Sequence, residues 1–145
     1  MKSMAVAPYL FFNGNCEQAL HFYQQALGAK LGAIHRFSDA PPNAGPGGQP
    51  MCPPESMNQI MNAEFTIGTS TLYASDCPPG RYQPPQGISL TISVTTADEV
   101  QQIFAALSQG GKVNMPPSET FFAQNFGMLT DKFGIAWMVI APKAV

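Results

Sequence analysis

Apolar residues recur along the chain in two patterns, one typical of helices and the other of strands. Two segments have apolar side chains at spacings of three and four residues, which gather on one side of an α-helix. The first segment has Ala19, Leu20, Tyr23, Ala26 and Leu27 at these positions, and the second has Val100, Ile103, Phe104 and Leu107. The spacing therefore predicts two amphipathic helices.

The boundaries of the two predicted helices also repeat. Asn15 and Thr96 are suitable N-cap residues, and each is followed three residues later by a Gln or a Glu that can bond back to the cap. Gly28 and Gly110 supply the left-handed conformation that ends many helices. The interval between the two caps is almost the same as the interval between the two glycine stops. This constancy predicts an internal duplication.

Strand-like segments flank each predicted helix. Their apolar residues alternate with polar ones or form short apolar runs, and they span 6–13, 30–38, 60–67 and 71–76 in the first half and 88–95, 112–119, 123–130 and 136–141 in the second. Each half is therefore a βαβββ module. We predict an α+β protein, a single domain over 1–145, with modules at about 5–76 and 88–141 that form a curved eight-stranded sheet with the helices on the outside.

Two segments rich in proline and glycine interrupt these patterns. The segment 77–87 lies near the middle of the chain and is predicted to be a linker between the modules. The segment 39–56 holds six Pro and three Gly, and such long loops often act as lids over binding sites. We therefore expect 39–56 to be a mobile loop at one rim of the sheet.

The low charge of the chain restricts the functional classes to which it can belong. Only 16 of 145 residues are Lys, Arg, Asp or Glu, which is 11%, and the net charge is −2. A nucleic-acid-binding protein would need a basic face to neutralise phosphates, so that class is excluded. No apolar run approaches the roughly 20 residues of a membrane span, and we expect no membrane partner and no secretory signal. The three cysteines have no Cys-x-x-Cys spacing, which favours a reduced, cytoplasmic protein.

Several motifs resemble those of one protein family. They are Pro-Tyr-Leu-Phe-Phe-Asn-Gly-Asn-Cys at 8–16, Glu-Thr-Phe-Phe-Ala at 119–123, and Thr-Asp-Lys-Phe-Gly at 130–134 followed by Trp137 and Met138. Together with the two βαβββ modules, they resemble the PhnB-like branch of the vicinal oxygen chelate superfamily, which includes glyoxalase I, bleomycin-binding proteins and extradiol dioxygenases. The resemblance implies the glyoxalase/bleomycin resistance-like fold.

The resemblance also implies a site for a divalent metal, which the superfamily holds with His and Glu side chains from four strands. Local alignment puts these positions at Pro8, at Tyr73 or Ser75, at Ser89 and at Met138. These side chains are poor ligands for a hard cation in comparison with imidazole and carboxylate. We therefore predict no metal and no cofactor.

Members of the branch are often labelled demethylubiquinone methyltransferase-like. A nucleotide-like cofactor would call for a glycine-rich loop between a strand and a helix. The glycines at 45–48 lead into further prolines instead. We therefore do not predict methyl transfer from this label.

Other residues are candidates for chemistry. Glu119, beside Phe121 and Phe122, is either a general base with a raised pKa or a structural carboxylate at a turn. Trp137 either lines a pocket or belongs to the core. The predicted pocket residues are Tyr73, Ser75, Ser89, Phe121, Phe122, Trp137 and Met138.

The histidines and cysteines are weaker candidates. His21 is expected to form a surface pair with Glu17 rather than to bind a metal, and His35 is expected at the surface. Cys16 lies in the first turn of a helix, where the helix dipole favours a thiolate. A nucleophile would also need a neighbouring base, so the expected role of Cys16 is that of a small buried residue that fits the turn.

Two classes of function follow from these residues. The first is a metal-free module that binds a small molecule, and the second is an enzyme that uses an unaligned metal site or Glu119 as a base. We also expect a homodimer, since 16 charged residues are too few to cover the surface of a 145-residue monomer.

Overall fold

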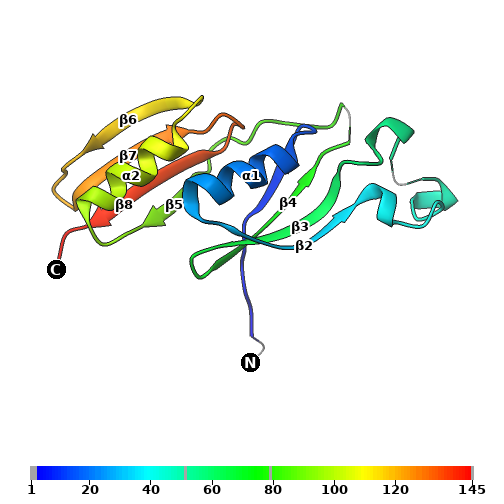
Figure 1. Ribbon diagram of the computed structural model, residues 1–145, viewed down its shortest axis with the longest axis horizontal. Coiled ribbons are helices and arrows are strands. Elements are labelled where there is room, and N and C mark those ends of the chain that lie inside the picture. Colours follow the sequence, from blue (N-terminus) through cyan, green and yellow to red (C-terminus); the bar gives the residue numbers. More distant parts are fainter. Residues whose placement is uncertain (1–2, 51, 79, 145) are drawn as a thin grey trace. The chain divides into compact units, whose positions relative to one another are not determined.

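Each half of the chain forms a four-stranded sheet with one α-helix, as the duplicated pattern predicts (Figure 1). The computed structural model describes residues 3–50, 52–78 and 80–144. The chain divides into two units, 1–82 and 83–145, here called unit 1 and unit 2. The predicted α+β class and the two βαβββ modules are confirmed.

The strands of both units have the same order. Unit 1 contains β1 (Tyr9–Phe12), α1 (Cys16–Leu27), β2 (Lys30–Arg36), β3 (Ile60–Ile67) and β4 (Ser70–Asp76), with sheet order β1-β4-β3-β2. Unit 2 contains β5 (Leu90–Ser93), α2 (Ala97–Leu107), β6 (Lys112–Ser118), β7 (Ala123–Thr130) and β8 (Ala136–Pro142), with sheet order β5-β8-β7-β6. In unit 1, β1 is parallel to β4, and in unit 2, β5 is parallel to β8. The other neighbouring strands are antiparallel. The shared order supports the predicted duplication.

A carboxylate at the end of β4 fixes the start of α1 in unit 1. Asp76, at the end of β4, accepts hydrogen bonds from the Cys16 backbone N–H (2.9 Å) and from the Ile60 backbone N–H at the start of β3 (3.0 Å). The predicted cap by Asn15 is wrong, because its side chain makes no capping hydrogen bond. Further along α1, the ring of Tyr23 stacks on Phe65 of β3, with centroids 6.1 Å apart.

The helix of unit 2 begins as its sequence predicts. The Glu99 backbone N–H donates to Thr96 Oγ1 (3.2 Å), and the Thr96 backbone N–H donates to Glu99 Oε1 (3.1 Å). The helix ends at Leu107, earlier than the predicted glycine stop. It packs on β7 and β8, where Phe104 covers Gly127 so closely that a Cβ there would lie 2.7 Å from the ring. Glycine at 127 is therefore required by this packing.

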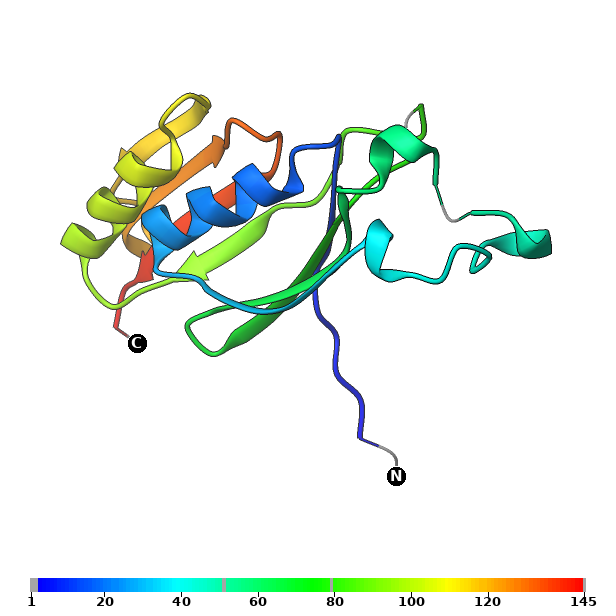
Figure 2. The same ribbon diagram turned by 45° about the vertical axis from the view of Figure 1, so that its right-hand side comes forward.

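The long loop between β2 and β3 projects beyond the sheet of unit 1 (Figure 2). It contains three short 3₁₀ turns, Phe37–Asp39, Pro46–Gly48 and Pro54–Ser56. Its two ends are joined, because the Phe37 N–H donates to the Gln59 carbonyl (3.1 Å) and the Ser38 N–H donates to the Met57 carbonyl (2.8 Å). The base of the loop therefore continues the pairing of β2 with β3. Residue 51 of this loop and residue 79 of the predicted linker lie outside the described residues.

A second buried carboxylate organises the last turn of unit 2. Asp131 Oδ1 accepts hydrogen bonds from the backbone N–H groups of Phe133 (2.8 Å) and Ile135 (3.1 Å), and Oδ2 accepts one from the indole N–H of Trp137 (2.8 Å). Both Asp131 and Trp137 are buried. The carboxylate thus joins the turn before β8 to the core below it.

In the described part of the chain, no helix has both the length and the apolar character needed to span a membrane.

The Asp131→Ala substitution should destabilise unit 2 strongly. It removes the acceptor of three hydrogen bonds, of which those of Ile135 and Trp137 are buried, and hydrogen bonds to charged groups contribute about 1.5–3 kcal/mol each. We expect a loss of about 3 kcal/mol or more in the free energy of unfolding, measured by urea titration with the fluorescence of Trp137, the one tryptophan in the sequence. Asp98→Ala, on the exposed side of α2, is the control and should cost less than about 1 kcal/mol. Equal losses in the two variants would contradict this role of Asp131.

Candidate functional site

The face of the unit 1 sheet that does not carry the helix, here called the open face of unit 1, displays aromatic rings. Tyr9 and Phe11 of β1 alternate with the buried Leu10 and Phe12, and Phe11 is 53% exposed. Tyr73, paired with Tyr9 in the parallel β1–β4 register, stacks on it with centroids 6.3 Å apart. The Tyr9 and Phe11 rings lie 4.9 Å apart. Ser75, predicted as a pocket residue, lies beside Phe11 in the register and is buried.

The open face of unit 2 has a different chemistry. Met138 of β8 is paired with Thr91 of β5, whose hydroxyl donates to the Met138 sulfur at 3.8 Å. Ser89 precedes β5 and is half-buried. The predicted residues Ser89 and Met138 thus belong to unit 2, whereas Tyr73 and Ser75 belong to unit 1.

Trp137 does not share the open face of unit 2. It is 1% exposed, and alternation along β8 places it with Val139 on the side where the helix packs. Its indole N–H is bonded to Asp131. Of the two predicted roles, the structure therefore gives Trp137 the one in the core, and its place among the pocket residues is corrected.

Glu119 and its aromatic neighbours lie at the surface of unit 2. The Glu119 side chain is 71% exposed, and its Oε2 is 2.9 Å from Lys143 Nζ. Phe121 is 92% exposed, while Phe122 contacts Phe121 and Phe126 edge-on, with centroids 5.2 and 5.4 Å away. The apolar enclosure that the predicted general base needs does not form around this carboxylate. The turn itself is held by Thr120 Oγ1, which accepts from the N–H groups of Phe122 and Ala123.

The residues at the implied metal positions do not fit a divalent cation. Pro8 offers only backbone atoms, and Met138 offers a thioether, which suits soft metals rather than hard ones. Within the residues described, no three His, Cys, Asp or Glu side chains gather closely enough to hold a metal ion. His21 is 3.9 Å from Glu17 on the surface of α1, and His35 is exposed on β2.

Cys16 is a buried structural residue rather than an activated nucleophile. Burial raises the pKa of its thiol far above the usual value, and the charges of Asp76 and Glu17 raise it further. The expected role of Cys16 as a small buried residue is confirmed, because desolvation and two nearby carboxylates outweigh the effect of the helix dipole on the thiol. Burial likewise raises the pKa of Cys52 and of Cys77.

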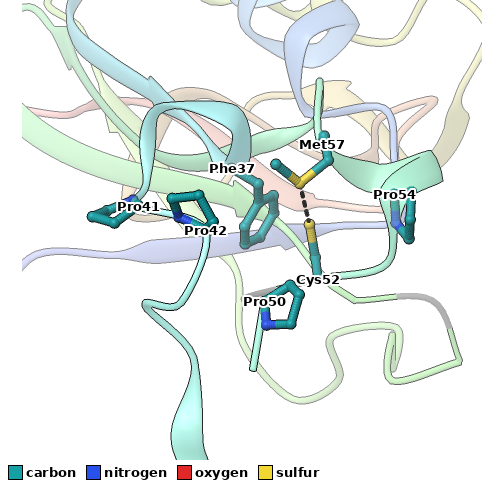
Figure 3. A pocket seen from close by; sticks show the side chains of 7 residues that line it. All are labelled: Phe37, Pro41, Pro42, Pro50, Cys52, Pro54 and Met57. Carbon is teal, nitrogen blue, oxygen red and sulfur yellow. Dashed lines mark hydrogen bonds between the residues drawn. The ribbon is translucent and has the colours of Figure 1, made fainter. Parts of the chain in front are cut away.

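An apolar pocket lies inside the long loop of unit 1 (Figure 3). Its volume is about 270 Å³. The lining consists of proline rings, Phe37, and two sulfur side chains, in which Cys52 Sγ donates to Met57 Sδ at 3.6 Å. Its one signal in the sequence is the unusual density of proline in 39–56. Among the described residues, no charged side chain lines the pocket, so they supply no charge that would orient a polar ligand.

A polar pocket of about 390 Å³ lies at the start of α1. It is lined by Glu17, Gln18 and His21 of α1, by Arg36 at the end of β2, by Asn58 and Gln59, and by Asp76. The Arg36 guanidinium donates to both oxygens of Glu17, at 3.2 and 2.7 Å, and to the Asn58 carbonyl at 2.8 Å. This cavity is here called the α1 pocket. No sequence pattern predicted it, because its walls come from four separate segments.

The charges of the α1 pocket act on one another. The hydrogen bond from Arg36 holds the pKa of Glu17 below its usual value. The hydrogen bonds with Glu17 raise the pKa of Arg36, and the charges of Glu17, Asp39 and Asp76 add to this effect. Both side chains of the pair are therefore ionised at neutral pH.

Comparison with known proteins gives a consistent result over nearly the whole chain. The family model described as 3-demethylubiquinone-9 3-methyltransferase matches residues 4–140. Protein YjdN of Escherichia coli (strain K12) is 34% identical over 139 residues, which cover 94% of each chain.

Solved structures agree with this result. The crystal structure of protein PA1353 from Pseudomonas aeruginosa is 40% identical, with a TM-score of 0.82 over 95% of this chain and 97% of that one. A PhnB protein from Bacillus cereus is 24% identical and shares the fold, with a TM-score of 0.73 over 94% of this chain and 98% of that one.

Proposed function

The chain belongs to the 3-demethylubiquinone-9 3-methyltransferase family, the PhnB-like branch of the vicinal oxygen chelate superfamily, and on this premise we propose that it is a metal-free small-molecule-binding protein. The ligand in this proposal is a largely apolar molecule with a planar group. It lies on the open face of unit 1, against Tyr9, Phe11 and Tyr73.

One observation carries this proposal, the exposed aromatic cluster on the open face of unit 1. Phe11 and Tyr9 are 53% and 40% exposed, although burial of large aromatic side chains is strongly favourable. The rings lie close together with tilted and stacked geometry, which suits a planar ligand. In unit 2, taken by itself, we propose that Ser89, Met138 and Phe122 form a separate contact surface with hydroxyl, thioether and aromatic groups.

The alternative, an enzyme that uses Glu119 as a base, has less support. The Glu119 carboxylate is 71% exposed and its Oε2 lies 2.9 Å from Lys143 Nζ, so it lies at the surface and not in an enclosed site where a base would meet a bound substrate. Methyl transfer, which the family description names, has no observation in its favour. The glycines at 45–48 lie in the long loop around a short 3₁₀ turn rather than between a strand and an α-helix.

We further propose a homodimer in the cytoplasm. Several apolar side chains are exposed on the described chain, among them Met4, Val6 and Ile88, and the segment before β1 runs away from its sheet in both views (Figures 1 and 2). A second copy could cover these groups and the edge strands. The unpaired thiols of Cys16, Cys52 and Cys77 suit a reducing compartment.

Removal of one aromatic ring should weaken binding of an apolar, planar probe. We expect Phe11→Ala to weaken the binding of 8-anilinonaphthalene-1-sulfonate, followed by its fluorescence, by about tenfold, which corresponds to roughly 1.4 kcal/mol for one lost aromatic contact. Val6→Ala removes an exposed apolar side chain outside the aromatic cluster and should leave the affinity unchanged. Equal affinities of the wild-type protein and Phe11→Ala would refute binding at the open face.

The protein should carry no stoichiometric divalent metal. Elemental analysis after purification without a chelator should give well below one ion per chain, because Pro8, Ser89 and Met138 replace the expected ligands. One tightly held Zn, Ni, Mn or Fe ion per chain, lost on substitution of His21, His35 or Glu119, would support the enzyme instead.

The dimer predicts a particle of twice the mass of the 15.5 kDa chain. Sedimentation equilibrium at micromolar concentration should give this doubled mass, because the apolar groups that the second copy covers are then removed from water. A single species with the mass of one chain, over the whole concentration range, would exclude the dimer.

A further inference from the structure

The α1 pocket of unit 1 has more negative than positive charge. Two carboxylates, Glu17 and Asp76, and one guanidinium, Arg36, line it, which gives a formal charge of −1 with His21 neutral. The Arg36 guanidinium forms an ion pair with Glu17, to which it donates two hydrogen bonds. The charge of Asp76 is therefore the one without a matching cation at ion-pair distance within the described residues.

Asp76 is a buried charge with neutral partners. It is 4% exposed, and its two oxygens accept from the backbone N–H groups of Cys16 and Ile60. A carboxylate has about four lone-pair sites, so each oxygen can accept one more hydrogen bond. Buried charges are normally paired, and an added cation at this position would meet that requirement.

Gln59 adds an unsatisfied acceptor to the same lining. Its Oε1 is buried and has no hydrogen-bond donor in the part of the chain that the structure describes, although the side chain lines the pocket. A buried acceptor without a donor costs about 1–3 kcal/mol. A ligand N–H group that reaches Gln59 Oε1 recovers this free energy.

We propose that the α1 pocket binds a small organic cation whose ammonium or amidinium N–H groups donate to Asp76 and Gln59. The excess of acceptors disfavours an anion, and the polar lining disfavours an apolar molecule. The volume of about 390 Å³ lies within the range of small-molecule sites. This site involves α1 and the ends of β2 and β4, and it is separate from the aromatic cluster on the open face of unit 1.

Three probes of equal length and different charge test the proposal: n-butylammonium, n-butanol and butyrate. Each is titrated into isotopically labelled full-length protein, and shifts of the Gln59 side-chain amide and of the Cys16 and Ile60 backbone amides are followed by NMR. We expect saturable shifts at millimolar concentration with butylammonium, weaker ones with butanol and none with butyrate. Equal or stronger binding of butanol or butyrate, or no saturable shift with butylammonium up to tens of millimolar, would overturn the proposal.

Two variants assign the binding to the pocket. Gln59→Leu removes the acceptor and should weaken butylammonium binding about fivefold, the equivalent of one hydrogen bond. Glu17→Gln makes the formal charge of the pocket zero and should weaken butylammonium binding about threefold. The effect is small because the Glu17 side chain is partly exposed to solvent. Glu55→Gln makes the same change in net charge in the long loop, outside the pocket, and should have no effect. Unchanged affinity in both pocket variants would overturn the site.

The experiment also separates this site from the proposed function. Butylammonium shifts confined to the aromatic cluster of Tyr9, Phe11 and Tyr73 would overturn the cation site and leave binding at the open face intact. Conversely, loss of dye binding in Phe11→Ala with normal butylammonium binding would support both sites.

Discussion

The fold of unit 1 depends on one buried carboxylate that satisfies backbone donors from two separate segments. Asp76 closes the end of β4, fixes the first turn of α1 and fixes the start of β3 through hydrogen bonds of 2.9 and 3.0 Å. The first N–H groups of a helix have no partner within the helix, so this contact decides where α1 begins. Burial raises the pKa of the Cys16 thiol at that helix start, and the charge of Asp76 raises it further. The carboxylate thus sets the start of the helix and adds to the effect of burial on the thiol.

How far the sequence predicts the fold depends on the range of each interaction. The capping box of Thr96 and Glu99 uses residues three apart, and it forms as predicted. The cap of α1 comes instead from Asp76, 60 residues away, and no local pattern around Asn15 could reveal it. The strands follow from alternation and short apolar runs along local segments, so their bounds were predictable to within a few residues. Contacts that join distant segments were not.

The same distinction explains which site residues were predictable. Tyr73 and Met138 were placed through the family resemblance, and alternation along a strand then keeps such positions on one face of the sheet. The role of Trp137 was left open by its position alone, and the distant carboxylate of Asp131 decides it. Neither pocket was predictable. The α1 pocket needs four segments to meet, and the apolar pocket needs the long loop to fold back so that Cys52 reaches Met57.

The two modules show why shared ancestry fixes the fold more firmly than the chemistry. On the parallel strand pair of unit 1 the open face presents Tyr9 beside Tyr73, and on that of unit 2 it presents Thr91 beside Met138. The core-facing positions between them stay apolar in both modules, as in Leu10 and Val139. Because successive side chains of a strand point to opposite faces, an open-face residue can change without disturbing the core. The two modules can therefore carry different side chains on their open faces at little cost to the fold, and the function of this chain has to be argued from the residues on its own open faces.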